Sequence, residues 1–128
     1  DVAELLALVR QQAPKQVLQS IPHKMGDRVL LIKVDDISYF QAEDKYVSFF
    51  TYDGASYLTD WSLKKLLERL PDHFLQVHRG IIVNTRSIFE FRRYFRGAYV
   101  LILNDKKNTR VETGRSFSAA VKRLIEME

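Results

Sequence analysis

Residues 74–93 have the sequence FLQVHRGIIVNTRSIFEFRR, and this stretch decides the fold. It contains three short apolar segments, at residues 75–78, 81–84 and 88–93, separated by polar residues or glycine. Apolar, β-branched segments of this length between polar turns are typical of β-strands. Because no helical stretch separates them, the strands are expected to pair mostly antiparallel. The stretch therefore predicts a β-dominated domain.

The same pattern of short strands continues on both sides of this stretch. Further strands are expected at residues 28–34, 37–41, 45–51, 56–58, 99–103 and 109–113. Asp53-Gly54 is a strong hairpin signal between two of them. One internal helix is expected from the spacing of Leu63, Leu66, Leu67 and Leu70. Asp60 or Ser62 is available as its N-cap and Pro71 ends it, and a last helix is expected from residue 116 or 118 to residue 127.

The N-terminal residues have a helical rather than a strand-like period. One helix face is indicated by Val2, Leu5, Leu6 and Val9. We interpret residues 1–21 as a linker helix from an upstream module, and residues 22–26, which include a proline and a glycine, as a connector. Because the sequence begins with Asp1, we expect it to be a piece of a longer protein. The expected organisation is a linker over residues 1–21 and one domain over residues 22–128.

The composition argues against several classes of protein. Cysteine is absent, which excludes disulfides, thiolate nucleophiles and cysteine-based zinc sites and fits a reducing cytoplasm. No apolar run approaches the roughly 18 residues of a membrane span. The histidines at positions 23, 73 and 78 lack metal-site spacing, and no nucleophile elbow or phosphate-binding glycine loop occurs. We expect no enzyme activity, no catalytic residue, no metal and no cofactor.

The basic residues are concentrated late in the chain. Residues 1–83 hold ten Lys/Arg against eleven Asp/Glu, whereas residues 84–128 hold ten Lys/Arg against five Asp/Glu. The net charge of +4 therefore arises in the C-terminal part. Clustered arginines gain from phosphate contacts and counterion release, so a polyanionic partner is one interpretation. A solvated basic surface explains the same charges, and composition alone leaves both interpretations open.

The order of motifs around residues 74–93 resembles that of one family. After a phenylalanine comes Val-His-Arg at residues 77–79, followed by an apolar triplet, Asn84 and a later isoleucine. A Lys-Tyr-Val segment at residues 45–47 precedes them, and Arg115 follows Val-Glu-Thr-Gly. Together these features resemble the LytTR family of bacterial DNA-binding domains over about residues 28–125. The departures are Gly80 and Gly114, where the family usually has serine and a small hydroxyl residue.

This resemblance implies a mainly β fold, with short antiparallel sheets in an elongated domain, that binds DNA by inserting loops into successive major grooves. The positions that match the family's DNA-contacting loops are Lys45, Asn84 and Arg115. By chemistry, arginine donates a bidentate pair to guanine and asparagine pairs with adenine, while lysine reaches a base or a phosphate. Positioning contacts to phosphates, which carry no sequence information, are expected from Arg79, Arg86, Lys106 and Lys107.

Other roles are open for some of these residues. Asn84 ends a predicted strand, where an asparagine often bridges backbone groups. Arg79 is equally suited to an ion pair with a nearby acid. We expect His78 to be a partly buried imidazole that holds a strand connection. Residues 96–100 are similar to the base-stacking strand of RNA-recognition motifs, but the surrounding strand order differs, so a tight turn followed by a core strand is the favoured interpretation.

We expect the chain to be a sequence-specific, double-stranded DNA-binding output domain of a bacterial transcription regulator of the response-regulator type. The resemblance implies an upstream receiver or sensor domain, a homodimer on direct-repeat promoter sites, and a cytoplasmic location. Two alternatives stay open. One is a domain that binds single-stranded nucleic acid or RNA, whose affinity depends on aromatic residues such as Tyr99. The other is a basic module that binds an acidic protein.

Overall fold

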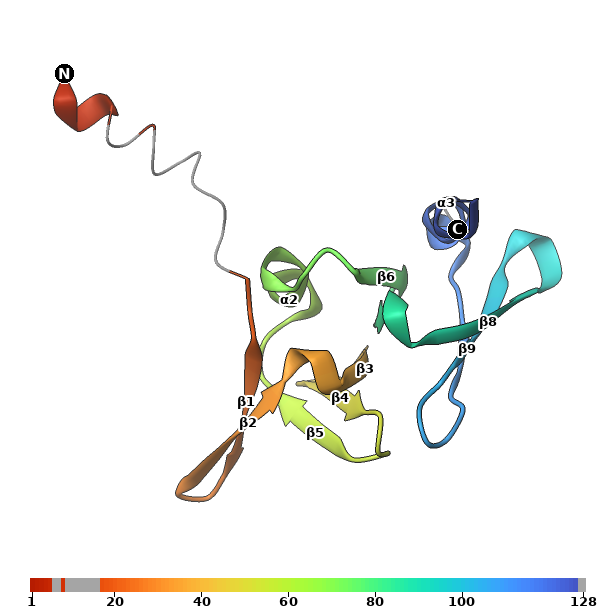
Figure 1. Ribbon diagram of the computed structural model, residues 1–128, viewed down its shortest axis with the longest axis horizontal. Helices are drawn as coiled ribbons and strands as arrows, with labels where there is room; N and C mark the ends of the chain where they lie inside the picture. Colours follow the sequence, from red (N-terminus) through yellow and green to blue (C-terminus); the bar gives the residue numbers. More distant parts are fainter. Residues whose placement is uncertain (6–7, 9–16, 127–128) are drawn as a thin grey trace.

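The computed structural model describes residues 1–5, 8 and 17–126, and its strands form three antiparallel sheets (Figure 1). The two-stranded sheet pairs β1 (Ser20–Met25) with β2 (Arg28–Lys33). The five-stranded sheet has the order β5-β4-β3-β7-β6, with bounds Ser56–Thr59, Val47–Thr51, Ile37–Ala42, Ile81–Asn84 and Phe74–His78. The three-stranded sheet has the order β10-β9-β8, with bounds Arg110–Glu112, Tyr99–Leu103 and Ile88–Arg93.

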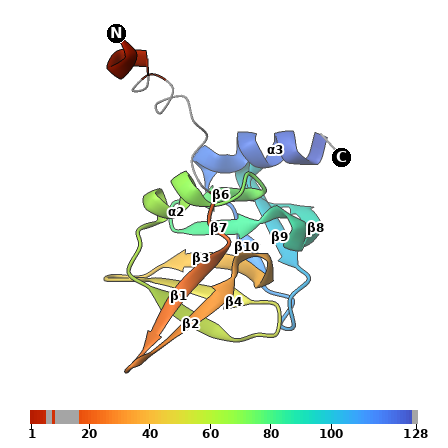
Figure 2. The same ribbon diagram turned by 60° about the vertical axis from the view of Figure 1, so that its left-hand side comes forward.

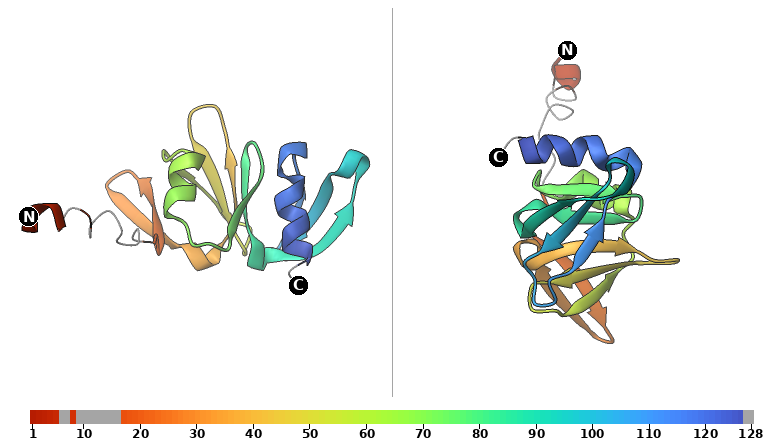
Figure 3. Two further views of the ribbon diagram at one scale, coloured as in Figure 1. Left: turned by 90° about the horizontal axis from the view of Figure 1, so that it is seen from above. Right: turned by 90° about the vertical axis from the view of Figure 1, so that its right-hand side faces the viewer.

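Within residues 17–126, two α-helices and four 3₁₀ turns accompany these strands, and the last of each follows β10. Helix α2 spans Leu63–Arg69 and helix α3 spans Ser118–Glu126. The 3₁₀ turns are η1 (Val34–Asp36), η2 (Thr85–Ser87), η3 (Phe95–Gly97) and η4 (Arg115–Phe117). The β-rich antiparallel fold is thus confirmed, with each strand predicted from residue 28 onward and both of these helices present. The three sheets follow one another along the long axis, so the domain is elongated (Figure 3).

Local sequence signals account for two of the connections. Gly54 lies in the turn between β4 and β5 with φ of 88°, a conformation that glycine adopts without steric cost. Ser62 caps helix α2, because its hydroxyl accepts a hydrogen bond from the backbone N–H of Lys65 at 3.1 Å. Both signals were visible in the sequence, and of the two candidate caps the structure uses Ser62.

Strand β7 is buried on both faces and separates two hydrophobic cores. Because successive side chains of a strand point to opposite faces, Ile82 joins one core and Val83 the other. The first core also contains Phe40, Phe49 and Leu66, and the second also contains Val77, Leu101, Leu103, Val111 and Val121. Burial on both faces explains why β7 is a continuous apolar run in the sequence.

The N-terminal part differs from its prediction. Residues 2–5 are helical, but most of the expected linker helix lies outside the described residues. Residues 20–25 form strand β1, where the end of a linker and a connector were expected. Proline is tolerated on a strand that pairs on one side only, and Pro22 lies on such a strand. Ile21, 1% exposed, anchors β1 in the first core.

The double burial of β7 predicts a large loss of stability on truncation. Ile82→Ala removes a fully buried side chain from the core that also holds Phe40 and Phe49, so the free energy of unfolding should fall by about 2–5 kcal/mol. Leu31→Ala removes a side chain that is 68% exposed and should change the free energy of unfolding by less than about 0.5 kcal/mol. Urea unfolding of both variants measures the difference. Equal effects in the two variants would contradict the assignment of β7 as the strand that is buried on both faces.

Candidate nucleic-acid interface

Three turns that are distant in the sequence meet along one edge of the domain. The backbone N–H of Ala42, which ends β3, donates to the carbonyl of Gly80 at 2.7 Å. The N–H of Gly114, which follows β10, donates to the carbonyl of Val77 at 2.9 Å. These bonds place residues 43–46, 79–80 and 114–117 side by side, and we call this surface the loop edge. The β3–β4 loop, the β6–β7 turn and the start of α3 line one side of the molecule (Figure 3, left).

The first part of the loop edge is the connection between β3 and β4. The N–H of Glu43 donates to the carbonyl of Tyr46 at 2.8 Å, which closes the loop into a tight turn. Lys45 lies within this turn and is exposed. Tyr46 beside it is 45% exposed and was not among the expected DNA contacts. Its position next to Lys45 in a predicted loop was the sequence feature that could have identified Tyr46 as a surface residue of this loop.

The second part is the turn between β6 and β7, which His78 holds in shape. The Nδ1 atom of His78 accepts a hydrogen bond from the backbone N–H of Gly80 at 3.1 Å, and the imidazole is partly buried. The amide of Gln76 donates to the carbonyl of Arg79 at 3.3 Å. The structural role expected for His78 is therefore confirmed. Arg79 lies between His78 and Gly80, and its side chain is exposed. It forms no ion pair with any other described residue.

The third part is Arg115, at the start of η4. Gly114 packs so closely before it that an added Cβ would lie 3.3 Å from the ring of Phe117 and 3.7 Å from the Cα of His78. Gly114 thus replaces the hydroxyl residue usual in the family at a point where the chain passes close to the β6–β7 turn. Arg115 itself is exposed. The loop edge therefore brings together Lys45, Arg79 and Arg115.

Asn84 does not belong to the loop edge. It ends β7 at the opposite end of the strand, where it is 2% exposed. Its amide nitrogen donates to the carbonyl of Ile37 at 3.0 Å, and its amide oxygen accepts from the N–H of Arg86 at 3.0 Å. This is the backbone-bridging role that the sequence left open for Asn84. Because the amide is bonded at both ends and almost fully shielded from solvent, its geometry favours the backbone-bridging role of Asn84 over a base contact.

The remaining expected phosphate contacts also lie away from the loop edge. Arg86 is exposed in η2, which follows the far end of β7. Lys106 and Lys107 are exposed in the turn between β9 and β10. The N–H of Lys106 donates to the carbonyl of Tyr52 at 2.8 Å, which places this turn beside the β4–β5 hairpin. These three cations therefore occupy the end of the sheet opposite Lys45, Arg79 and Arg115.

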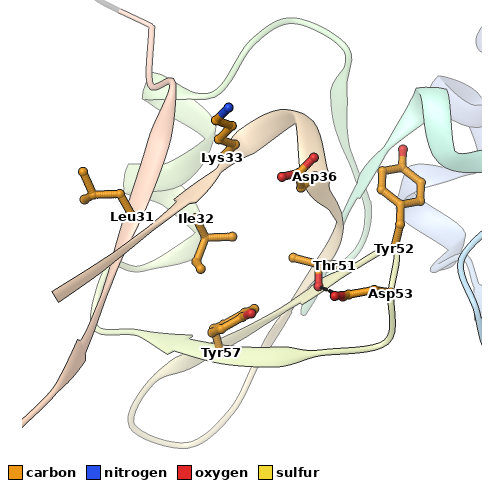
Figure 4. Close-up of a pocket in the computed structure, with 8 residues that line it drawn as sticks. All are labelled: Leu31, Ile32, Lys33, Asp36, Thr51, Tyr52, Asp53 and Tyr57. Atoms are coloured by element: carbon orange, nitrogen blue, oxygen red, sulfur yellow. Dashed lines mark hydrogen bonds between the residues drawn. The ribbon is translucent and has the colours of Figure 1, made fainter. Parts of the chain in front are cut away.

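A hollow of about 460 Å³ lies at that opposite end (Figure 4). Its charged residues are Lys33, Asp36 and Asp53. The Asp53 carboxylate accepts a hydrogen bond from the Thr51 hydroxyl, which lowers the pKa of Asp53. Of the three charged residues that line the hollow, two are acids and one is a lysine, so the lining itself does not favour a polyanion.

Several alternative sites can be compared with the structure. In the described residues, no group of three or more histidine or acidic side chains is placed to hold a metal ion. Within the same part of the chain, no helix is long and apolar enough to cross a membrane. Residues 96–100, which resemble an RNA-binding strand, form a tight turn and the start of β9. Residues 100–103 of this strand are buried. This matches the favoured interpretation of that segment.

Helix α3 packs against β6, next to the loop edge, and against η4, which is part of it. It lies against β6 (Figure 2) and buries Val121 in the second core. Its first turn follows η4 directly, so its packing fixes the backbone that carries Arg115. The inner face of α3 is used for this packing. The exposed side chains of Lys45, Arg79 and Arg115 lie on the turns in front of this helix.

Comparisons with known proteins agree with this architecture. A family model for the LytTr DNA-binding domain matches residues 27–126. A solved LytTr DNA-binding domain of a response regulator from Bacillus cereus superposes with a TM-score of 0.74 at 21% identity, covering 84% of this chain and 97% of that one. This likeness shows the shared fold.

Curated relatives include sensory transduction protein LytT of Bacillus subtilis, 31% identical over 80% of this chain and 42% of its own length. An uncharacterized response regulatory protein of Vibrio cholerae is 43% identical over 76% of this chain and 40% of its own length. The transcriptional regulatory protein LytR of Staphylococcus aureus is 29% identical over 84% of this chain and 43% of its own length. The chain thus spans about two fifths of the length of these relatives. With the family model matching most of its length, the chain belongs to the LytTr DNA-binding domain family.

Proposed function

We propose that this domain binds double-stranded DNA sequence-specifically and that the loop edge is the surface that enters the major grooves. The observation that carries the proposal is the meeting of Lys45, Arg79 and Arg115 on three turns joined by the Ala42–Gly80 and Gly114–Val77 hydrogen bonds. All three side chains are exposed. Cations in a row along a protruding edge match the charge and the extended shape of a duplex.

Each side chain suits a distinct contact. Arginine donates a bidentate pair to guanine O6 and N7, so Arg115 and Arg79 are assigned to bases. Lys45 reaches a base or a phosphate from the neighbouring loop. Arg79 takes the place that the sequence analysis gave to Asn84, because it lies between the other two cations and its side chain is exposed. Arg86, Lys106 and Lys107 lie outside this surface and are left out of the assignment.

The fixed shape of the turns also favours base reading. A side chain that reads bases must be held in register with its neighbours, since a loose loop loses entropy on binding. The 43–46 turn is closed by its own hydrogen bond, the Arg79 turn by His78, and Arg115 by close packing around Gly114. The backbone beneath all three cations is therefore preorganised before DNA arrives.

For the whole protein, we propose the output domain of a response-regulator type of transcription factor without enzyme activity. The names of the relatives, which include a response regulatory protein and transcriptional regulators, support this assignment. Because the chain spans about two fifths of their length, an upstream receiver or sensor domain is part of the proposal. Two domains bound as a homodimer to direct repeats in a promoter would double the surface for phosphate contacts.

Substitutions of arginines on the loop edge, compared with one at the other end of β7, test this proposal. Selection from a random duplex library supplies a binding site, and gel shifts measure affinity for it and for single-base variants. Arg115→Ala and Arg79→Ala should each weaken binding by about 5- to 150-fold, the equivalent of about 1–3 kcal/mol, and relax preference at one base position. The matched control is Arg86→Ala, which removes the same charge at the other end of β7 and should retain the preference. Loss of base preference in Arg86→Ala alone would contradict the proposal.

For Asn84, we expect a substitution to lower stability and to leave base preference unchanged. Asn84→Ala leaves the buried carbonyl of Ile37 without its donor, so the free energy of unfolding should fall by about 1–3 kcal/mol. At a temperature where the variant is folded, its base preference in the same gel shifts should equal that of the wild type. An altered base preference with unchanged stability would return Asn84 to the DNA-reading set.

A further inference from the structure

The tip of the β8–β9 hairpin exposes a cluster of arginine and aromatic side chains that the loop edge does not include. Phe95 is 76% exposed and Tyr94 is 45% exposed. Arg93 and Arg96 flank them and are exposed as well. The two rings pack edge-to-face on each other at 5.0 Å rather than into either core. Large exposed apolar groups gathered in one place mark interaction surfaces more often than they serve stability.

The backbone of this tip is held in a sharp turn. The N–H of Tyr94 donates to the carbonyl of Ala98 at 2.9 Å, and the N–H of Ala98 donates to the carbonyl of Phe95 at 3.2 Å. Arg96 has φ of 57° and Gly97 has φ of 80°, so two successive residues adopt the left-handed conformation. A non-glycine residue in this conformation is uncommon. The turn therefore presents Arg96 at some cost in backbone energy.

Hydrogen bonds place the tip next to the loop edge. Tyr99, the first residue after the turn, accepts a bond from the N–H of Thr113 at 2.9 Å and donates its own N–H to the Thr113 hydroxyl at 2.9 Å. Thr113 precedes Gly114 and Arg115, so the tip follows the third part of the loop edge. The tip, the start of α3, the β6–β7 turn and the β3–β4 loop lie in this order along one side (Figure 3, left).

The charges at the tip are available to a partner. Arg92 is paired with Glu90, and this hydrogen bond lowers the pKa of the Glu90 carboxyl. Within the described part of the chain, Arg93 and Arg96 form no ion pair and no side-chain hydrogen bond. Two free guanidinium groups beside two exposed rings are complementary to the backbone of a nucleic acid, with phosphates for the cations and sugars for the rings.

We infer that the β8–β9 tip is a further DNA-contacting element, which lies against the minor groove at one end of the site contacted by the loop edge. Arg93 and Arg96 bind phosphates, and Phe95 packs into the groove against the sugars. An apolar side chain next to basic residues is the combination that minor-groove wedges use. The inference rests on the proposed function of the loop edge, because that surface sets where the duplex lies.

Hydroxyl-radical footprinting tests this inference, since the radicals attack sugars from the minor groove. The wild-type domain on a selected duplex should protect a central region and a flank at one end. Phe95→Ala should lose protection of that flank and keep the central region. The double variant Arg93→Ala, Arg96→Ala should lose the flank as well. Its slope of log K against log salt concentration should become less negative by about 1.8, because two phosphate contacts are removed.

The matched control is the double variant Lys106→Ala, Lys107→Ala, which removes two charges from the turn at the opposite end of the same sheet. Its footprint and salt slope should equal those of the wild type. Tip variants whose footprint and slope match this control, with melting temperatures equal to the wild type, would overturn the inference and leave the loop edge standing. Absence of any protected region with the wild type would overturn the proposed function and the tip together.

Discussion

The burial of β7 on both faces is the constraint on which the rest of the structure depends. Ile82 packs into the core formed with Phe40 and Phe49, while Val83 packs into the core that holds α3 and the three-stranded sheet. A shift of one residue along this strand would exchange the two side chains between the cores, so the register with β3 and β6 is strongly specified. The turn that precedes β7 is therefore fixed relative to both halves of the domain.

Fixed turns have a consequence for recognition. The loop edge is built from connections rather than from strands, and its shape is held by backbone hydrogen bonds and the His78 imidazole. The exposed side chains of Lys45, Arg79 and Arg115 take no part in either core. On the proposed function, exchanging these side chains would alter which DNA sequence the surface binds without altering the fold. This separation of a rigid scaffold from variable loop residues is how many binding surfaces are organised.

Most strands could be predicted because burial leaves a local pattern, namely apolar runs of four to six residues between polar turns. Strand β1 escaped prediction because Pro22 and the exposed Lys24 and Met25 look like a connector, while Ile21 is its one fully buried residue. Asn84 suits two roles by chemistry, and only its burial distinguishes them. The grouping of Arg79 with Arg115 depends on hydrogen bonds between residues distant in sequence, such as Gly114 and Val77, which no local pattern reveals.

On the proposed function, DNA lies along the loop edge and not at the opposite end of the sheet. Amide chemical-shift mapping of the ¹⁵N-labelled domain, titrated with a selected duplex, tests this most directly. We expect the largest shifts at residues 43–46, 79–80 and 114–117, with residues 52–55 and 104–108 nearly unchanged. The reverse pattern, with large shifts around Lys106 and Lys107 and none around Arg79, would contradict it.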